Sequence, residues 1–303
     1  MNRIEHLFRT LQKEVPGLEL RENEPMSRHT TFRVGGPAAL MALPDTEDKL
    51  LAAVRISRAE GIEPLWVGMG SNLLVDDGGL DTFVIKTAPQ LSACSVDGVL
   101  ITASAGTPLV QIANAAADRS LTGLEFAHGI PGSLGGAVTM NAGAYDGEMR
   151  QVVKSVRVLD QNGLVCDIPA EECDFRYRHS LFSSSEFLVL SAVMELKQGD
   201  EVAIRARMAE LMAKRKEKQP LEWPSAGSTF KRPEGYFAAA LIDQCGLKGL
   251  RLGGAQVSEK HAGFVINAGD ATCYDILKLM DQVRERVLAE TGVTLEPEVK
   301  YLR

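Results

Sequence analysis

Glycines concentrate in an uncharged segment between His128 and Tyr145, which has the sequence HGIPGSLGGAVTMNAGAY. Five of its eighteen residues are glycine, and none is Asp, Glu, Lys or Arg. Glycine lets a backbone approach a ligand closely and leaves peptide N–H groups open to anionic oxygens. The interspersed Ile130, Leu134 and Val138 are too apolar for a solvated linker. The segment therefore predicts a turn that contacts a cofactor rather than a mobile loop.

Composition excludes several classes of protein. The chain has 303 residues, a length typical of about two or three domains, and 45% of them are apolar, enough for real cores. A net charge of −7, without a basic stripe carrying aromatics, argues against nucleic acid as a partner. The five cysteines form no CxxC pair and no zinc-type spacing, and an odd number disfavours a disulfide framework. We expect reduced thiols, no metal and a cytoplasmic location.

Two segments raise the question of targeting or membrane insertion. Residues 1–15 mix charged and apolar residues as a short surface helix does, unlike a signal peptide. Residues 99–117 are uncharged, but the Gly106–Pro108 turn divides them, and Gln111 and Asn114 are polar. We expect a strand, a turn and a helix there, with Thr107 as N-cap and Pro108 at the first helical position. No membrane association is predicted.

Hydrophobic periodicity and turn signals predict a chain rich in β-structure, with a charged helix over 201–218 at a domain junction. Expected strands cover 38–43, 64–67, 73–75, 82–86, 99–105, 152–159, 164–168, 187–196, 255–257 and 264–267. Expected helices cover 48–60, 108–118, 201–218 and 237–244, and a last long helix follows the capping box Thr272–Asp275 and ends before Gly292. Asn162-Gly163 indicates a hairpin.

Common nucleotide motifs are missing. Gly68-Met-Gly70-Ser-Asn-Leu73 lacks the third glycine of GxGxxG and precedes an expected strand, which disfavours a Rossmann unit, and GxxxxGK[ST] is absent. A pair of glycine turns remains, over 68–72 and 129–136. Their N–H groups and the hydroxyls of Ser71 and Ser133 could converge on one diphosphate.

Several motifs along the chain resemble those of a known family. The resemblance is carried by Arg33-Val-Gly-Gly36, Gly68-Met-Gly-Ser-Asn-Leu-Leu-Val75, Gly129-Ile-Pro-Gly-Ser-Leu-Gly-Gly-Ala-Val138, Met140-Asn-Ala-Gly-Ala-Tyr145, Tyr177-Arg-His-Ser180, Ser225-Ala-Gly-Ser-Thr-Phe-Lys-Arg-Pro233, Gly254-Ala-Gln-Val257 and Leu295-Glu-Pro-Glu-Val299. In this order they are similar to the UDP-N-acetylenolpyruvoylglucosamine reductases (UDP-N-acetylmuramate dehydrogenases). The short link from Arg178 to Leu196 resembles the compact, second type of that family.

The resemblance implies an α+β fold: a two-part FAD-binding region of the vanillyl-alcohol-oxidase (PCMH) type and a C-terminal α/β substrate-binding domain. We expect the two FAD-binding subdomains over 1–90, with the N-terminal helix, and 91–200. The substrate-binding domain is expected over 201–303. FAD is expected to bind without a covalent link. Its implied contacts are Gly68, Gly70, Ser71, Asn72, Leu73, Gly129, Pro131, Gly132, Ser133, Gly135, Gly136, Ala137, Asn141 and Gly143.

The implied reaction reduces UDP-N-acetylglucosamine enolpyruvate to UDP-N-acetylmuramate for peptidoglycan synthesis, with NADPH as the co-substrate. Hydride passes from flavin N5 to the vinyl carbon, and the resulting enolate is then protonated. By motif register, Arg178 binds the substrate carboxylate, Ser228 donates the proton, and Glu298 stabilises or protonates the enolate. Composition alone would allow a surface role for Arg178 and would make Ser225 as good a candidate as Ser228.

Contacts for the substrate are expected from several residues, and the lysines and Arg232 among them are candidates for the UDP diphosphate. The candidates are Tyr145, Lys216, Lys218, Lys231, Arg232 and His261. Arg232 stands where a larger subgroup of the family carries Asn, so a diphosphate contact there is in doubt. Glu296 is expected to be a surface carboxylate rather than a catalytic one.

Two other functions are compatible with these motifs. The chain could be another FAD oxidase or dehydrogenase of the same superfamily, although oxidation would not require the 226–233 segment together with Glu298. It could also be an inactive regulator that binds FAD or a nucleotide sugar, although Arg178, Ser228 and Glu298 are all in register. We expect an active, monomeric enzyme.

Overall fold

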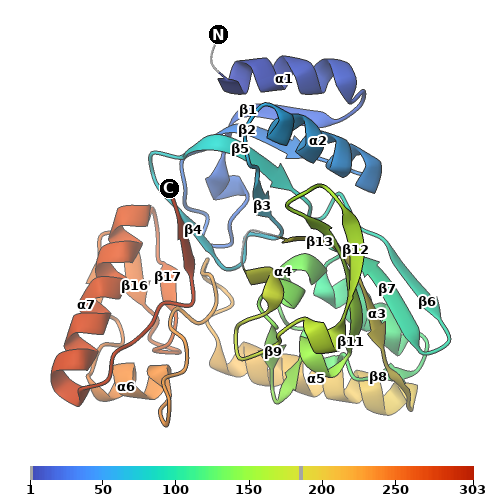
Figure 1. Cartoon of the computed structure of the whole chain (residues 1–303). Helices are drawn as coiled ribbons and strands as arrows, with labels where there is room; N and C mark the ends of the chain where they lie inside the picture. The colour runs from blue at the N-terminus through green and yellow to red at the C-terminus, as the bar shows by residue number, and fades with distance from the viewer. Residues whose placement is uncertain (1–2, 184–186) are drawn as a thin grey trace. The chain divides into compact units, whose positions relative to one another are not determined.

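The chain forms two compact units, each assembled from segments that are distant in sequence. A computed structural model describes residues 3–183 and 187–303 (Figure 1). The first unit comprises the chain up to Arg21 with Leu40–Met69 and Thr82–Arg215, and the second comprises Glu22–Ala39, Gly70–Asp81 and Lys216–Arg303. The three-part division expected from the resemblance stays a prediction.

Seven α-helices occur in the described ranges: α1 (Arg3–Glu14), α2 (Glu47–Ala59), α3 (Leu109–Ala117), α4 (Leu134–Thr139), α5 (Glu201–Lys218), α6 (Ala238–Gln244) and α7 (Cys273–Thr291). The strands are β1 (Glu19–Pro25), β2 (Pro37–Leu43), β3 (Leu65–Val67), β4 (Leu73–Val75), β5 (Leu80–Lys86), β6 (Cys94–Asp97), β7 (Leu100–Ser104), β8 (Leu121–Thr122), β9 (Gly143–Ala144), β10 (Gly147–Glu148), β11 (Val153–Asp160), β12 (Val165–Pro169), β13 (Phe187–Glu195), β14 (Lys197–Gln198), β15 (Arg251–Leu252), β16 (Ala255–Val257), β17 (Val265–Asn267) and β18 (Lys300–Leu302). Every expected strand and helix has a counterpart among them. None of the described helices is both long and apolar enough to span a bilayer.

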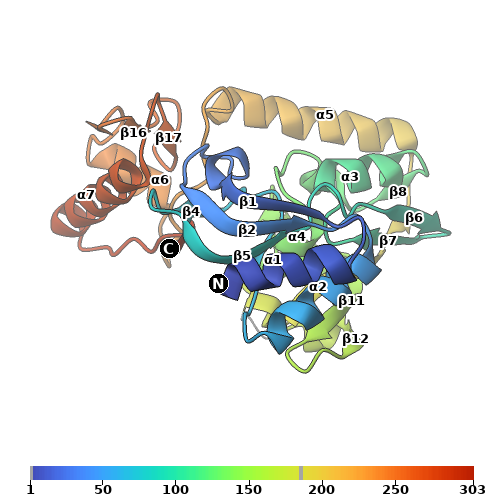
Figure 2. The same cartoon turned by 90° about the horizontal axis from the view of Figure 1, so that it is seen from above.

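A four-stranded sheet in the order β1-β2-β5-β3 organises the first core. The helices α1 and α2 lie against this sheet (Figure 2). Leu7 and Leu11 of α1 share one helical face because they are four residues apart, and both are fully buried. They pack with Leu50 and Val54 of α2 and with Phe83 of β5. The amphipathic N-terminal helix predicted from the sequence is confirmed.

A second sheet has the antiparallel order β12-β11-β13-β7-β6. The predicted hairpin is present: β11 pairs with β12, and Gly163 between them has a φ of 82°. Helices α3, α4 and α5 contribute side chains to the core of this sheet. Ile204 and Met208 place one face of α5 in that core. The helix predicted at a domain junction thus packs, up to Arg215, within the first unit.

Two local predictions are wrong. The glycine segment 128–145 was expected to form a turn, but its centre forms α4, because Leu134, Ala137 and Val138 bury their side chains in the core. This packing outweighs the low helix propensity of Gly135 and Gly136. Thr107 does not cap α3. Pro108 occupies the cap position, and the Thr107 hydroxyl donates to the Ala93 carbonyl at 2.9 Å.

The second unit is built on α7 and the sheet β15-β16-β17. The predicted capping box is confirmed, since Thr272 Oγ1 accepts from Asp275 N and Asp275 accepts from Thr272 N. The N–H groups of Cys273 and Tyr274 donate to the Asp77 carboxylate, a second cap that the sequence did not reveal. The C-terminal strand β18 pairs in parallel with β4, which follows the first glycine turn. A strand thus follows that turn, whereas the glycine turn of a Rossmann unit is followed by a helix.

The end of β3 leaves no room for a side chain at Gly68. A Cβ atom built there would lie 2.5 Å from Ser133 Oγ, and the next nearest atom, Ser133 Cβ, lies at 3.8 Å. The obstacle is therefore a single oxygen of the residue that precedes α4. A side chain at position 68 would force the buried Ser133 hydroxyl to move.

We predict that Gly68→Ala destabilises the cofactor-free protein by about 1–3 kcal/mol through overpacking. In a Ser133→Ala background the obstructing oxygen is gone, so the same substitution should cost much less. A double-mutant cycle on the free energy of unfolding in urea measures this coupling. Gly136→Ala is the matched control, because nothing lies within 4 Å of its Cβ position in α4. It should stabilise the protein by about 0.5–1 kcal/mol. Equal costs for Gly68→Ala in both backgrounds would contradict the steric account.

Candidate functional site

In the first glycine turn, residues 68–72, carbonyl groups accept hydrogen bonds from other parts of the protein, whereas N–H groups find no acceptor among the described residues. The carbonyls of Gly68, Gly70 and Asn72 accept from Lys86 Nζ, Thr31 N and Lys300 N at 2.9, 3.2 and 2.9 Å. The backbone N–H groups from 69 to 72 donate to no acceptor in the described part of the chain. Consecutive free N–H groups form a binding site for an anion.

Ser133 provides a hydroxyl beside this turn. The residue is only 2% exposed, and its Oγ atom has no hydrogen-bond partner within 3–183 and 187–303. A buried polar atom without a partner is uncommon in proteins and calls for a ligand or a water. Ser133 Oγ lies on the side where Gly68 lacks a Cβ atom, 2.5 Å from that position, so the unpartnered hydroxyl is next to the start of the glycine turn. These features fit a phosphate-bearing group.

The second glycine turn contributes fewer free N–H groups than the first. The N–H groups of Gly132, Leu134 and Gly135 donate to the carbonyls of Ile130, Thr107 and Ala105. The first two N–H groups of α4 are thus satisfied by the protein itself. What this turn offers to a ligand is the Ser133 hydroxyl and a surface free of bulky side chains, with Pro131 and Gly136 exposed.

Lys86, a cation that the sequence analysis did not identify, lies under the first turn. Its residue is 8% exposed, and burial lowers the pKa of its amine to about 8. The sequence signal is a lysine that follows the apolar run Phe83–Ile85 at the end of β5, in register with Val67 of β3.

Arg215, on α5, is a second cation that was not predicted. Its Cδ atom lies 3.2 Å from the Cβ position of Gly129, and burial lowers the pKa of its guanidinium. No described carboxylate pairs with it. Arg215 continues the helical spacing of the buried residues Ile204, Met208 and Leu211, so the periodicity of α5 could have indicated its burial.

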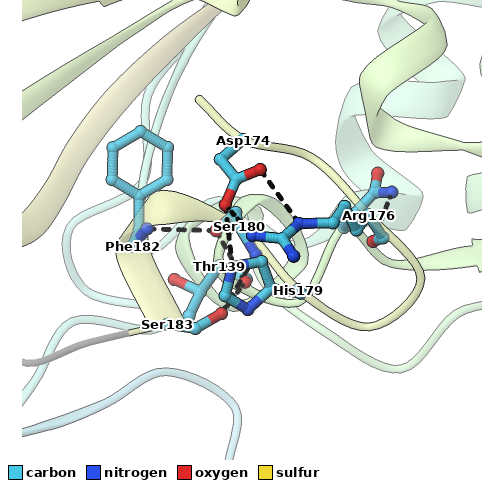
Figure 3. Close-up of polar contacts among 8 residues, drawn as sticks. Thr139, Asp174, Arg176, His179, Ser180, Phe182 and Ser183 are labelled. Carbon is cyan, nitrogen blue, oxygen red and sulfur yellow. Dashed lines mark hydrogen bonds and ion pairs between the residues drawn. The ribbon is translucent and has the colours of Figure 1, made fainter. Parts of the chain in front are cut away.

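Arg178 sits in a tight turn held by charged neighbours. Backbone hydrogen bonds in both directions join Arg176 to His179, so Arg178 is near the tip, with a φ of 53°. Figure 3 shows that the Asp174 carboxylate contacts the side chains of both Arg176 and His179. Arg176 Nε donates to Asp174 Oδ1 at 2.9 Å, and His179 Nε2 lies 3.2 Å from Asp174 Oδ2.

The turn is also anchored to the glycine segment. The hydroxyls of Ser180 and Ser183 donate to the Thr139 carbonyl at the end of α4, at 2.7 and 3.0 Å (Figure 3). Arg178 Nη2 donates to the Gly143 carbonyl at 3.4 Å. The structure therefore brings Arg178 to the glycine segment, as a site that joins substrate and cofactor requires.

Asn141 supports the same arrangement. Its Nδ2 donates to Glu148 and to the Arg176 carbonyl, and its Oδ1 accepts from Arg150 N. With these bonds the fully buried side chain holds the glycine segment to the Arg178 turn. Because these bonds occupy its side chain, Asn141 would contribute to a cofactor site by ordering the backbone around it.

In the second unit, the backbones of 228–231 and 296–298 run side by side. Glu298 N donates to the Thr229 carbonyl and Lys231 N to the Glu296 carbonyl, both at 2.8 Å. This pairing places Ser228, which is exposed, near Glu298, which is half-buried. Asn72 of the first glycine turn joins them, since its Nδ2 donates to the Glu298 carbonyl at 3.1 Å.

Glu296 and Ser225, the alternatives to Glu298 and Ser228, have different surroundings. Glu296 is 71% exposed and forms an ion pair with Lys231 at 3.1 Å, as expected of a surface carboxylate. Ser225 is half-buried and lies outside the backbone pairing that brings Ser228 to Glu298.

The residues expected to bind the substrate do not all line one cavity. Lys231, Arg232 and Tyr236 line a cavity of about 360 Å³, where the Arg232 guanidinium stacks on Phe237 at 3.9 Å from the ring centre. Lys216, Lys218 and His261 do not line that cavity.

The other UDP candidates have different neighbours. Lys216 and Lys218 are exposed. His261 packs on Phe264, and burial lowers the pKa of its imidazole. Tyr145 belongs to the first unit, with its phenol close enough to Arg215 to counter the lowering of the Arg215 pKa.

Comparison with known proteins identifies both parts of the chain. Residues 38–168 match the FAD binding domain model, and residues 219–302 match the model of the UDP-N-acetylenolpyruvoylglucosamine reductase C-terminal domain. A UDP-N-acetylenolpyruvoylglucosamine reductase of Caldanaerobacter subterraneus subsp. tengcongensis is 49% identical over 280 residues, covering 92% of each chain. The enzyme of the same name from Clostridioides difficile is 46% identical and covers 98% of this chain and 96% of its own.

A solved structure agrees with the sequence comparisons. The crystal structure of UDP-N-acetylenolpyruvylglucosamine reductase from Thermus caldophilus superposes with a TM-score of 0.81 at 36% identity. The superposition covers 94% of this chain and 99% of that one. The α+β fold with a PCMH-type FAD-binding region is thereby confirmed, and the chain belongs to the UDP-N-acetylenolpyruvoylglucosamine reductase family, whose members are FAD-dependent enzymes that use NADPH.

Proposed function

We propose that Arg178, Ser228 and Glu298 carry the family's reduction of UDP-N-acetylglucosamine enolpyruvate to UDP-N-acetylmuramate in this chain, next to FAD held by the two glycine turns. The proposal rests above all on the first turn, where the buried and unpartnered Ser133 hydroxyl lies 2.5 Å from the Cβ position of Gly68. Bound FAD supplies the hydride that it receives from NADPH. The protein's own task is to orient the substrate and to manage charge and a proton.

FAD would lie with its diphosphate at the Met69 N–H group and at Ser133 Oγ, two donors that have no acceptor in the described part of the chain. The remaining candidates would make the surface along the cofactor. They are Leu73, Gly129, Pro131, Gly132, Gly135, Gly136, Ala137, Asn141 and Gly143.

Arg178 would bind the carboxylate of the enolpyruvyl group. A guanidinium can donate to both carboxylate oxygens, and it stabilises the enolate more than the substrate because negative charge grows there after hydride addition. The network around Asp174 and the anchors on Thr139 and Gly143 fix the turn that carries Arg178, so little reorganisation is needed during the reaction.

Ser228 would donate the proton to the enolate carbon that bears the carboxylate. A serine hydroxyl is a weak acid, so it needs a charged neighbour and a source from which to regain its proton. The backbone pairing puts Glu298 at the neighbouring position, and the exposure of Ser228 gives access to water. Glu298 would stabilise the intermediate or supply the replacement proton.

The diphosphate of UDP would bind near Lys231 and Arg232, which line the 360 Å³ cavity. Lys216, Lys218, His261 and Tyr145 remain candidates for further contacts. We also propose a monomer that works in the cytoplasm with its cysteines reduced, consistent with five cysteines that form no disulfide.

The purified protein should be yellow, and under anaerobic conditions NADPH should bleach the flavin absorbance. The enolpyruvyl substrate should then restore the colour, because it removes the hydride. A colourless protein that rejects added FAD would contradict the cofactor site. Bleaching that oxygen reverses but the enolpyruvyl substrate does not would point to another reaction of the same superfamily.

We predict that Ser228→Ala leaves reduction by NADPH unchanged but slows reoxidation by the enolpyruvyl substrate about 10²–10⁴-fold, the usual contribution of a general acid. Stopped-flow measurement of the two half-reactions separates these effects. Ser225→Ala is the matched control and should behave like the wild type in both. Normal reoxidation by Ser228→Ala would assign the proton to another donor.

A further inference from the structure

Lys86 is a buried cation directly beneath the first glycine turn. It ends β5 in register with Val67, the last residue of β3, and it is 8% exposed. Its Nζ donates to the Gly68 carbonyl at 2.9 Å. This is the only hydrogen bond of the ammonium within residues 3–183 and 187–303, so two of its three N–H donors are unused there.

No negative charge compensates Lys86. None of the described carboxylates forms an ion pair with it, and desolvation is the sole cause of its lowered pKa. Burying an ammonium without a counter-ion is costly, and proteins rarely retain such a group without a purpose. The position therefore suits an anion that arrives from outside the chain.

The Gly68–Met69 peptide connects this charge to the free side of the turn. The carbonyl and N–H of a trans peptide point in opposite directions, so the Met69 N–H points away from Lys86. That N–H has no acceptor in the described chain. An ammonium on the carbonyl oxygen polarises the peptide and makes its N–H a stronger donor.

We propose that Lys86 is the buried counter-charge for the diphosphate of FAD and acts on it through the Gly68–Met69 peptide. The inference rests on the proposed cofactor site and adds to it a residue that makes the glycine turn electropositive. Backbone N–H groups alone carry only partial charges, whereas a diphosphate brings full negative charge into a partly buried site. Lys86 supplies the missing positive charge without exposing a side chain to the ligand.

The test compares two variants that differ in one property. Lys86→Gln keeps an N–H donor for the Gly68 carbonyl but has no charge, whereas Lys86→Met loses both. Lys154→Met is the matched control, since Lys154 is a half-exposed lysine of β11 that pairs with Glu195 at 3.2 Å. For each protein, the FAD is removed, the Tm of the cofactor-free form is recorded, and the Kd for FAD is measured by quenching of flavin fluorescence.

Both Lys86 variants should raise the Kd for FAD about tenfold to fiftyfold, the effect of one charge at this range in a protein interior. The Tm of the cofactor-free Lys86→Gln protein should equal or exceed that of the wild type, because a desolvated charge has been removed. Lys154→Met should change neither quantity.

Wild-type affinity in Lys86→Gln would overturn the inference, because the hydrogen bond alone would then suffice. A loss of affinity accompanied by a lower Tm of the cofactor-free Lys86→Gln protein would also overturn it, in favour of a structural role. A wild-type protein that binds no FAD is a separate result: it would refute the proposed function, and this inference with it.

Discussion

The close approach of the Gly68 backbone to Ser133 is the constraint on which the site depends. Because position 68 has no side chain, the end of β3 can lie against Ser133, the residue that precedes α4. The turn that follows then uses its carbonyl groups to hold itself to the protein, and its N–H groups remain available. A glycine-rich sequence thereby becomes a fixed set of donors instead of a flexible loop, and the entropy cost of ordering it is met during folding.

Hydrogen bonds within the protein also fix the turn that carries Arg178. A residue with positive φ at the tip of a turn would be mobile by itself. Here Asp174 ties the two sides of the turn together, while Ser180, Ser183 and Asn141 bind it to α4 and the glycine segment. One glycine-rich stretch therefore supports both the proposed surface for the cofactor and the arginine proposed to bind the substrate. Such supporting hydrogen bonds hold a catalytic group in its productive geometry.

Local patterns were sufficient to predict most of the elements, because apolar alternation, caps and turn residues act over a few positions. β4 and α5 match their predicted ranges, and the capping box of α7 forms as expected. The short helix α4 escaped prediction because core packing overrides the propensity of its glycines. Thr107 looked like a cap, but its hydroxyl found a partner 14 residues away in the chain.

The site was predictable only through its resemblance to a family, and its supporting residues were not. The segments that carry Ser228 and Glu298 come together because 229–231 pair with 296–298, a long-range contact that no local pattern encodes. Lys86 and Arg215 were overlooked because a charged residue is expected at the surface, and its burial depends on neighbours distant in sequence.

The most direct test of this account is a crystal structure of the protein with FAD bound. We predict that the diphosphate oxygens accept hydrogen bonds from the Met69 N–H group and from Ser133 Oγ, which would then gain the partner that it lacks. A diphosphate bound elsewhere, with Ser133 Oγ still unpartnered and the Met69 N–H group facing water, would contradict the account.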